Sequence, residues 1–188
     1  MRYLNCLILV AILGSLQGCF PVIVAGVGAG AMMAADRRTT GTYIEDGSIE
    51  LKAKNQINLK YQDTAHVNVT SFNRHVLVTG EVPNEESKAD ISRIVTGVVN
   101  VKAVSNELLV SGKTGLSSRS SDSLITADVN LRFINNKVFQ PAHVKVITEN
   151  GTVFLMGLVF HKEADTAAEI ASTTSGVQRV VKVFEYLD

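Results

Sequence analysis

The sequence has 188 residues, which is enough for one or two small domains. Hydrophobic residues make up 46% of it and charged residues 19%, a composition typical of a globular protein that excludes a largely disordered chain. The 18 basic and 18 acidic residues give a formal net charge of zero, so the basic excess expected of a nucleic-acid-binding protein is missing. Cys6 and Cys19, the two cysteines, both lie near the N-terminus, so we expect neither a disulfide nor a cysteine-based zinc site in the rest of the chain.

The N-terminus has the layout of a secretory signal. Arg2 supplies a positive charge, an apolar run follows, and small residues precede Cys19. The segment Leu16-Gln17-Gly18-Cys19 resembles the lipobox of bacterial lipoproteins, in which the cysteine is acylated and becomes the first mature residue. We therefore predict a signal peptide over residues 1–18, lipidation of Cys19 and a lipidated tether over residues 19–45.

Two other interpretations of this segment stay open. A plain signal peptide could be cleaved elsewhere, or the apolar residues 4–35 could remain as a transmembrane anchor, which needs about 20 apolar residues. Pro21 and the nearby glycines weaken a single stable helix. Phe20, rather than an aspartate, follows Cys19, so the resemblance to lipoproteins implies anchoring in the outer membrane at its periplasmic face.

The rest of the chain contains an internal repeat, which predicts duplicated structural units. A Ser- and Gly-rich stretch, residues 111–122, separates the two copies and is expected to form a flexible linker between module 1, residues 46–110, and module 2, residues 123–188. The matching blocks are Ala65-His66-Val67 with Ala142-His143-Val144, Val76–Val82 with Val153–Val159, and Gly97-Val98 with Gly176-Val177.

Each copy predicts the element order α-β-β-α-β. Glu149-Asn150-Gly151-Thr152 predicts a hairpin turn, because Asn-Gly tolerates positive φ at both central positions. Asn84 is expected to cap a helix that ends near Thr96, and its counterpart is expected to end at Ser175. The other expected elements are first helices at about 48–60 and 123–136, hairpin strands at about 66–71, 75–82, 143–149 and 152–160, and last strands at about 101–110 and 180–187.

The predicted fold class is therefore α+β, with two helices packed on one face of a three-stranded mixed sheet in each module. The pattern resembles the BON domain, and the whole chain resembles dual-BON outer-membrane lipoproteins. That resemblance implies a periplasm-facing protein that binds anionic phospholipid, such as phosphatidylglycerol, concentrates at division sites and supports envelope integrity. The residues that carry it are Leu16–Cys19, Asp46-Gly47, Val144–Val159, Ser175-Gly176-Val177 and Arg179-Val180.

The first helices of the two modules share one apolar stripe and differ in a second. The shared stripe should face the sheet; its members are Ile49, Ala53 and Ile57 in module 1 and Ile125, Val129 and Phe133 in module 2. The second stripe is apolar only in module 2 and lies almost opposite the first. It consists of Leu124, Ala127, Leu131 and Ile134, where module 1 has Ser48, Leu51, Asn55 and Asn58.

The second stripe is a candidate phospholipid-binding surface, with Asn130, Arg132 and Lys137 beside it as polar contacts to lipid headgroups. The resemblance places lipid contact on this helix, at Leu124, Asn130 and Ile134. The alternative is that the stripe packs against module 1 or against the linker.

The sequence predicts a binding protein, with no catalytic residues, no metal ligands and no cofactor. His66 and His143 are expected to mark strand starts, Asp46 and Asp122 to cap helices, and Glu163 to be a solvated charge at a helix start. A second hypothesis is a protein-binding adaptor for envelope assembly or cell-wall and division proteins, without direct lipid recognition. The sequence indicates no nucleic-acid partner and leaves the oligomeric state unknown.

Overall fold

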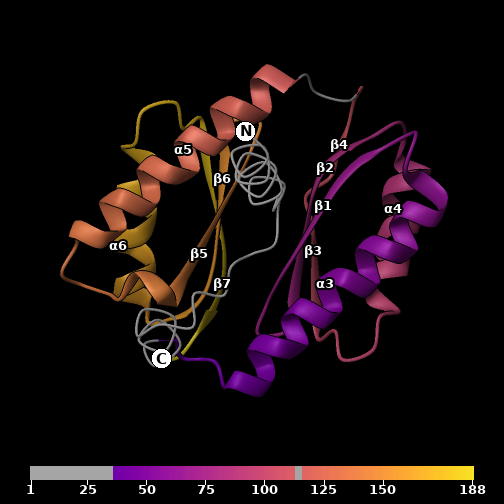
Figure 1. Ribbon diagram of the computed structural model, residues 1–188. Helices are drawn as coiled ribbons and strands as arrows, with labels where there is room; N and C mark the ends of the chain where they lie inside the picture. Colours follow the sequence, from indigo (N-terminus) through magenta and orange to yellow (C-terminus); the bar gives the residue numbers. More distant parts are fainter. Residues whose placement is uncertain (1–35, 113–115) are drawn as a thin grey trace, which may run out of the picture. The chain divides into compact units, whose positions relative to one another are not determined.

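The computed structural model describes residues 36–112 and 116–188 of the chain (Figure 1). The predicted signal peptide, the lipidated Cys19 and the tether as far as residue 35 lie outside the described residues. Across the two described ranges, no helix combines the length and the hydrophobicity that crossing a membrane requires.

Module 1 has the predicted element order, with the last strand divided in two. β2 is central: it pairs antiparallel with β1 and parallel with β3 and β4. β3 and β4 keep one register along β2, so they are two pieces of the predicted last strand. The elements are α3 (Thr40–Tyr61), β1 (His66–Phe72), β2 (His75–Val82), α4 (Glu85–Thr96), β3 (Ala103–Asn106) and β4 (Leu109–Val110).

Module 2 repeats this arrangement. β6 pairs antiparallel with β5 and parallel with β7, and both helices lie on one face of the sheet, as they do in module 1 (Figure 1). The predicted α+β class and two-module organisation are confirmed. The elements are α5 (Leu116–Asn135), a short 3₁₀ helix η1 (Pro141–His143), β5 (Val144–Glu149), β6 (Thr152–Val159), α6 (His161–Ser172) and β7 (Arg179–Tyr186).

The helix ends differ from the prediction. α3 begins at Thr40 rather than near residue 48, because Thr39 supplies the N-cap and its Oγ1 accepts a hydrogen bond from the Thr42 backbone N–H at 3.1 Å. α5 begins at Leu116, inside the predicted flexible linker. The sequence from there to Asn135 has no glycine or proline to interrupt a helix. α6 ends at Ser172, before the expected Ser175.

The shared apolar stripe is buried in both modules, as predicted. Ile49, Ala53 and Ile57 of α3 belong to one core with the helix-facing side of β1 and β2. The core of module 2 is built in the same way, on Ile125, Val129 and Phe133 of α5. Burial of these side chains is therefore what orients each first helix on its sheet.

The opposite face of each sheet is also buried, which explains why β6 is apolar along almost its whole length. Alternate residues of a strand point to opposite faces, so Val153 and Leu155 face the helices whereas Phe154 and Met156 face away from them. The residues on that second face form one apolar cluster with residues of module 1. Its buried members are Phe72, Leu77, Phe154, Met156, Leu158 and Val183.

Candidate functional site

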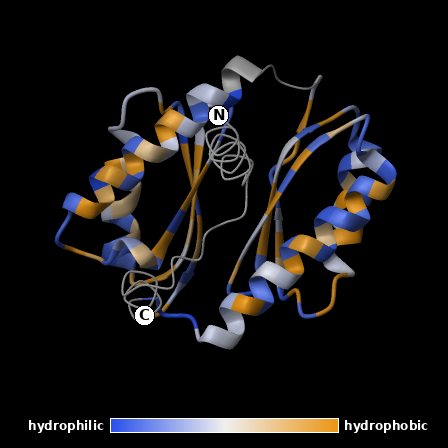
Figure 2. Ribbon diagram, in the orientation of Figure 1, coloured by the Kyte–Doolittle hydropathy of each residue, from blue (hydrophilic) through white to orange (hydrophobic). Residues whose placement is uncertain are grey.

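The second apolar stripe of α5 is exposed. Leu124, Leu131 and Ile134 have exposed fractions of 73%, 60% and 64%, and Ala127 between them is exposed too. Figure 2 shows apolar residues recurring along α5 among polar ones. None of the described residues covers this stripe, so within residues 36–112 and 116–188 it does not pack against module 1.

Two of the three polar neighbours, Asn130 and Lys137, are exposed to solvent. Asn130 is exposed, and its side-chain amide donates to the Thr126 carbonyl of the same helix at 2.9 Å. Lys137 is exposed in the loop after α5, next to the half-exposed Val138. Asp128 is exposed on α5 as well and adds a negative charge.

Arg132 has a different role from the one predicted. Its Nη1 donates to the Ile170 carbonyl at 2.8 Å and to Thr174 Oγ1 at 2.6 Å, and its Nη2 donates to Thr173 Oγ1 at 3.0 Å. A guanidinium at the C-terminal end of α6 satisfies carbonyl oxygens there and complements the helix dipole. Arg132 therefore ties α5 to α6, and in this arrangement it does not reach toward the exposed stripe.

The difference between the first helices is smaller than the sequence comparison suggested. α3 also exposes apolar side chains, because it begins eight residues early and so includes Tyr43 and Ile44, and because Leu51 and Leu59 are 62% and 89% exposed. On α3, however, polar residues separate these side chains. Those residues are Ser48, Asn55 and Asn58, which occupy the positions of Leu124, Leu131 and Ile134 on α5.

A buried aspartate holds the hairpin turn of each module, which corrects the prediction that these residues cap helices. Asp122 lies in the second turn of α5 and accepts hydrogen bonds from the backbone N–H groups of Asn150 and Gly151, at 2.9 and 2.8 Å. Asp46 of α3 accepts equivalent bonds from Asn73 and Arg74, at 2.9 and 2.7 Å. The helix and the hairpin are thus joined in the same way in both copies.

The turns held by these aspartates have the predicted backbone geometry. Asn150 and Gly151 have φ values of 50° and 68°, and Asn73 and Arg74 have values of 52° and 66°. Arg74 has a Cβ and so adopts this left-handed conformation at a cost. The hydrogen bond from its N–H to Asp46 offsets that cost, which is how a turn without glycine keeps the geometry of Asn-Gly.

Each module, with its aspartate-held hairpin turn, corresponds to one match to a known protein family. The BON domain matches residues 45–112 and 121–188, beginning next to each aspartate. The chain belongs to the BON-domain family. Its two modules are therefore referred to below as BON1 and BON2.

Three relatives match most of the chain. "Outer membrane lipoprotein DolP" of Haemophilus influenzae is 43% identical over 176 residues, which cover 92% of this chain and 91% of the relative. The "21 kDa hemolysin" of Actinobacillus pleuropneumoniae is 33% identical over 81% of this chain and 79% of its own length. "Osmotically-inducible protein Y" of Escherichia coli is 26% identical over 81% of this chain and 78% of its own length.

The segment before α3 contacts both BON domains through adjacent arginines. Arg37 forms a bidentate ion pair with Glu163 of BON2, at 2.6 and 2.8 Å, and donates to the Leu158 carbonyl at 2.8 Å. Arg38 donates to Asp46 of BON1 at 2.9 Å. Glu163, predicted to be solvated, is instead buried, and it also accepts from the Phe160 backbone N–H at 2.9 Å. The tether and BON2 are therefore linked by this charge pair.

We predict that acid weakens this link. Burial alone would raise the pKa of Glu163, but hydrogen bonds from Arg37 and from the Phe160 backbone lower it below its ordinary value of 4.5. A carboxylate with a depressed pKa stabilises the folded state above its unfolded pKa, and that contribution is lost as pH falls through the folded pKa. The stability difference between the wild type and Glu163→Gln, measured by urea unfolding, should therefore shrink below about pH 4.5. An unchanged difference from pH 7 to pH 3 would contradict the prediction.

Proposed function

We propose that this chain is a non-catalytic outer-membrane lipoprotein whose BON2 domain binds anionic phospholipid through the exposed stripe of α5. Acylated Cys19 anchors it at the periplasmic face of the membrane. The observation that carries the binding proposal is the exposure of Leu124, Leu131 and Ile134 on one helix face. The relationship to a lipoprotein named for the outer membrane supports the anchoring.

The energetics of the stripe suit a lipid surface. Full burial of a leucine or isoleucine side chain contributes roughly 1.5–3 kcal/mol, so even partial insertion of Leu124, Leu131 and Ile134 is favourable. Lys137 adds about 1 kcal/mol near anionic headgroups, and the exposed Asp128 opposes this. A surface with this little positive charge depends mainly on its apolar side chains for affinity. The acyl chains strengthen the binding further, because they hold the domain beside the bilayer at high effective concentration.

In this proposal, binding of anionic lipid by BON2 determines where in the outer membrane the protein accumulates. Concentration at division sites and support of envelope integrity follow from selective binding to anionic lipid. An adaptor for envelope assembly or division proteins is the second hypothesis. The exposed apolar residues of α3, Tyr43, Ile44, Leu51 and Leu59, give such a partner a surface on BON1.

Vesicle flotation tests the lipid proposal. The protein is residues 19–188 with Cys19→Ser, so that no acyl chain contributes to binding. We expect it to float with phosphatidylglycerol vesicles, and we expect Leu124→Glu with Ile134→Glu to reduce the floated fraction at least about tenfold, since two inserted side chains are lost and two negative charges are added.

A matched control is available on α3. Leu51→Glu with Leu59→Glu changes two leucines of similar or greater exposure and adds the same charge, but it leaves α5 intact. Flotation of this variant should equal that of the parent protein. If both variants lose binding equally, the effect is general charge repulsion. If the parent does not float, the adaptor hypothesis replaces lipid binding.

A further inference from the structure

β7 forms a free edge of the BON2 sheet. The strand order is β5-β6-β7, and each residue of β7 from Arg179 to Tyr186 pairs with β6 on one side. Among the described residues, no strand pairs with its other side. An unpaired edge presents backbone N–H and C=O groups that are able to pair with a further strand.

The backbone groups of alternate β7 residues point to this edge. Just past the end of β7, the Leu187 N–H donates to the Val159 carbonyl of β6 at 3.1 Å. Backbone groups alternate in direction along a strand, so the odd-numbered residues of β7 are turned toward β6 and the even-numbered ones toward the edge. The N–H and C=O groups of Val180, Lys182 and Phe184 are therefore available for pairing.

The equivalent edge of BON1 is interrupted. β3 and β4 have four and two residues, and between them the Leu108 N–H donates to the Asn106 side chain at 3.2 Å. Short, broken edges resist pairing with another strand. β7 instead runs for eight residues without a glycine or a proline, so it is the edge of the two that suits a partner strand.

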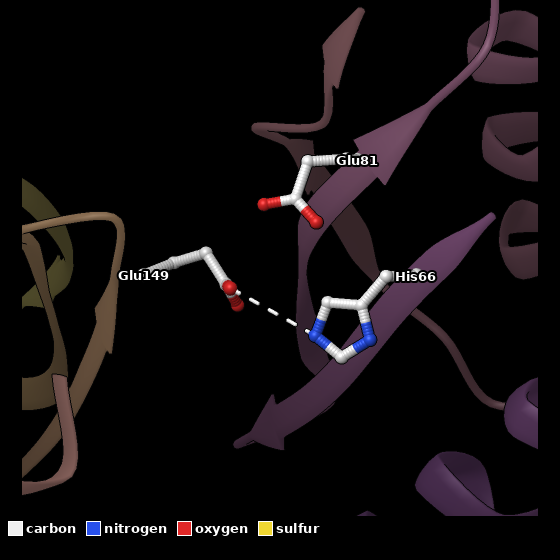
Figure 3. A group of neighbouring side chains, drawn as sticks. All are labelled: His66, Glu81 and Glu149. Atoms are coloured by element: carbon white, nitrogen blue, oxygen red, sulfur yellow. Dashed lines mark ion pairs between the residues drawn. The ribbon is translucent and has the colours of Figure 1, made fainter. Parts of the chain in front are cut away.

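BON1 contacts the face of the BON2 sheet. Val183 of β7 belongs to the apolar cluster that the two domains share. At β5, on the edge opposite β7, Glu149 lies beside His66 and Glu81 of BON1, and its Oε1 is 3.8 Å from His66 Nε2 (Figure 3). These contacts hold BON1 against the sheet without placing one of its strands beside β7.

The two ends of β7 carry opposite charges. Arg179 and Glu185 are both exposed, and neither forms an ion pair with any residue in the described part of the chain. Glu185 Oε2 accepts only from the neutral side-chain amide of Asn73, at 2.7 Å, which leaves its charge uncompensated. The two residues lie an even number of positions apart, so they are on the same face of the sheet, and Lys182 lies midway between them.

We propose that β7 pairs antiparallel with β7 of a second copy of this chain, about a two-fold axis at Lys182. In this register, Arg179 of each copy lies opposite Glu185 of the other, so both unpaired charges gain a partner twice per dimer. The pairing joins the three strands of each copy into one continuous sheet. The occupant of the edge is a second copy because the charge pattern of β7 is complementary to itself.

The apolar residues of β7 favour the same register. Val180 lies opposite Phe184 and Val181 lies opposite Val183, so apolar side chains meet apolar ones on both faces of the sheet. A shift of two residues in either direction would place Lys182 opposite Val180 or Phe184. The register centred on Lys182 is therefore the one that the sequence of the strand specifies.

The two copies of Lys182 meet at the axis, where like charges directly opposite each other are unfavourable. Each is compensated within its own copy, because Lys182 Nζ donates to Asp165 of α6 at 2.7 Å. α6 packs over β7, whereas α5 packs over β5 at the far edge. The exposed stripe of α5 thus stays free in the dimer, and the dimer does not depend on lipid binding.

Strand pairing of this length forms a small interface, so we expect a weak dimer in solution. Charge reversal tests it in residues 19–188 with Cys19→Ser, by sedimentation equilibrium at up to about 500 µM protein. Arg179→Glu and Glu185→Arg should each weaken self-association about tenfold or more, because both attractive pairs become repulsive. An equimolar mixture of the two variants should associate as the parent does, since every pair then joins opposite charges again.

Lys52→Glu is the matched control for the charge reversals. Lys52 is exposed on α3, so its replacement makes the same charge change as Arg179→Glu but leaves β7 unaltered, and self-association should equal that of the parent. Circular dichroism establishes that the variants are folded. A parent that stays monomeric up to about 500 µM, or a mixture that associates no better than either variant alone, would overturn the proposal.

Cysteine cross-linking tests the register. The Cys19→Ser protein contains no thiol, so Lys182→Cys introduces a single one at the axis, where the two Cα atoms are about 5.5 Å apart and within disulfide range. Tyr186→Cys is the control: Tyr186 is 41% exposed, as is the Lys182 side chain, but its two copies lie about 26 Å apart in the dimer. Mild oxidation should yield covalent dimer with Lys182→Cys alone. Equal cross-linking of both variants would contradict the proposed pairing.

Discussion

Replacing Asp122 with alanine should destabilise BON2 by about 2–4 kcal/mol, because it leaves two backbone N–H groups of the hairpin turn without their acceptor. Those groups belong to Asn150 and Gly151, and Asp122 and the N–H of Gly151 are buried. Water therefore cannot fully replace the carboxylate. Urea unfolding followed by circular dichroism measures the loss, which should appear as a lower midpoint at an unchanged m-value.

Asp128→Ala provides the control for this experiment. Asp128 lies on the same helix and carries the same charge but is exposed, so its replacement should change stability by less than about 0.5 kcal/mol. Asp46→Ala should repeat the large effect in BON1, where the carboxylate also accepts from Ser71 Oγ at 2.7 Å. If Asp122→Ala and Asp128→Ala behave alike, the aspartate–turn contact is not what joins helix and hairpin.

The parts of the fold that were predictable from the sequence depend on local patterns. The Asn150-Gly151 turn, the Asn84 cap and the buried stripe through Ile125, Val129 and Phe133 each follow from residues close together in the chain. The internal repeat reinforced these predictions, since each pattern could be checked against a second copy. Strand positions were consequently accurate to within about two residues, except where the last strand of BON1 is interrupted.

The parts that were missed depend on contacts between distant residues. Asp46 and Asp122 have the sequence signature of helix caps, and only the earlier start of each helix places them inside it, facing a hairpin. Arg132 was assigned to the lipid surface because α6 could not be positioned beside it. The sequence alone predicts a solvated Glu163, because its partner, Arg37, precedes it by 126 residues. The repeat did contain one usable signal: an aspartate at equivalent positions in both copies, which suggested a shared role.

The sequence left open whether the second apolar stripe of α5 is exposed or packed; the structure has it exposed, and its role as a lipid surface stays a prediction. The prediction relied on a contrast with a polar α3, and α3 has exposed apolar residues of its own. What distinguishes α5 is the uninterrupted sequence of apolar side chains along one face, from Leu124 to Ile134. A lipid surface is formed by such continuity, whereas isolated apolar residues are common on any protein surface.

Gly157 to alanine should be among the most damaging small substitutions in the chain. A Cβ at this position would lie 2.3 Å from the carbonyl oxygen of His143, and the equivalent Gly80 of BON1 would place one 2.1 Å from the carbonyl oxygen of His66. Both obstacles are backbone atoms, so the strands must move apart rather than a side chain rotate. We expect a loss of about 3 kcal/mol for Gly157→Ala, at the upper end of the range for overpacking.

Gly47→Ala should instead raise the stability of the protein. Comparing this variant with Gly157→Ala shows whether the loss at Gly157 comes from the steric clash. Gly47 is exposed within α3 and has nothing within 4 Å of an added Cβ, so alanine should raise stability by about 0.5–1 kcal/mol through its higher helix propensity. Urea unfolding of the two variants under one set of conditions measures both changes. A large loss for Gly157→Ala beside a gain for Gly47→Ala would show that glycine is repeated at positions 80 and 157 because two strands approach closely there. Equal, small effects at both glycines would mean that the strands can separate at little cost, and the repeated glycine would need another explanation.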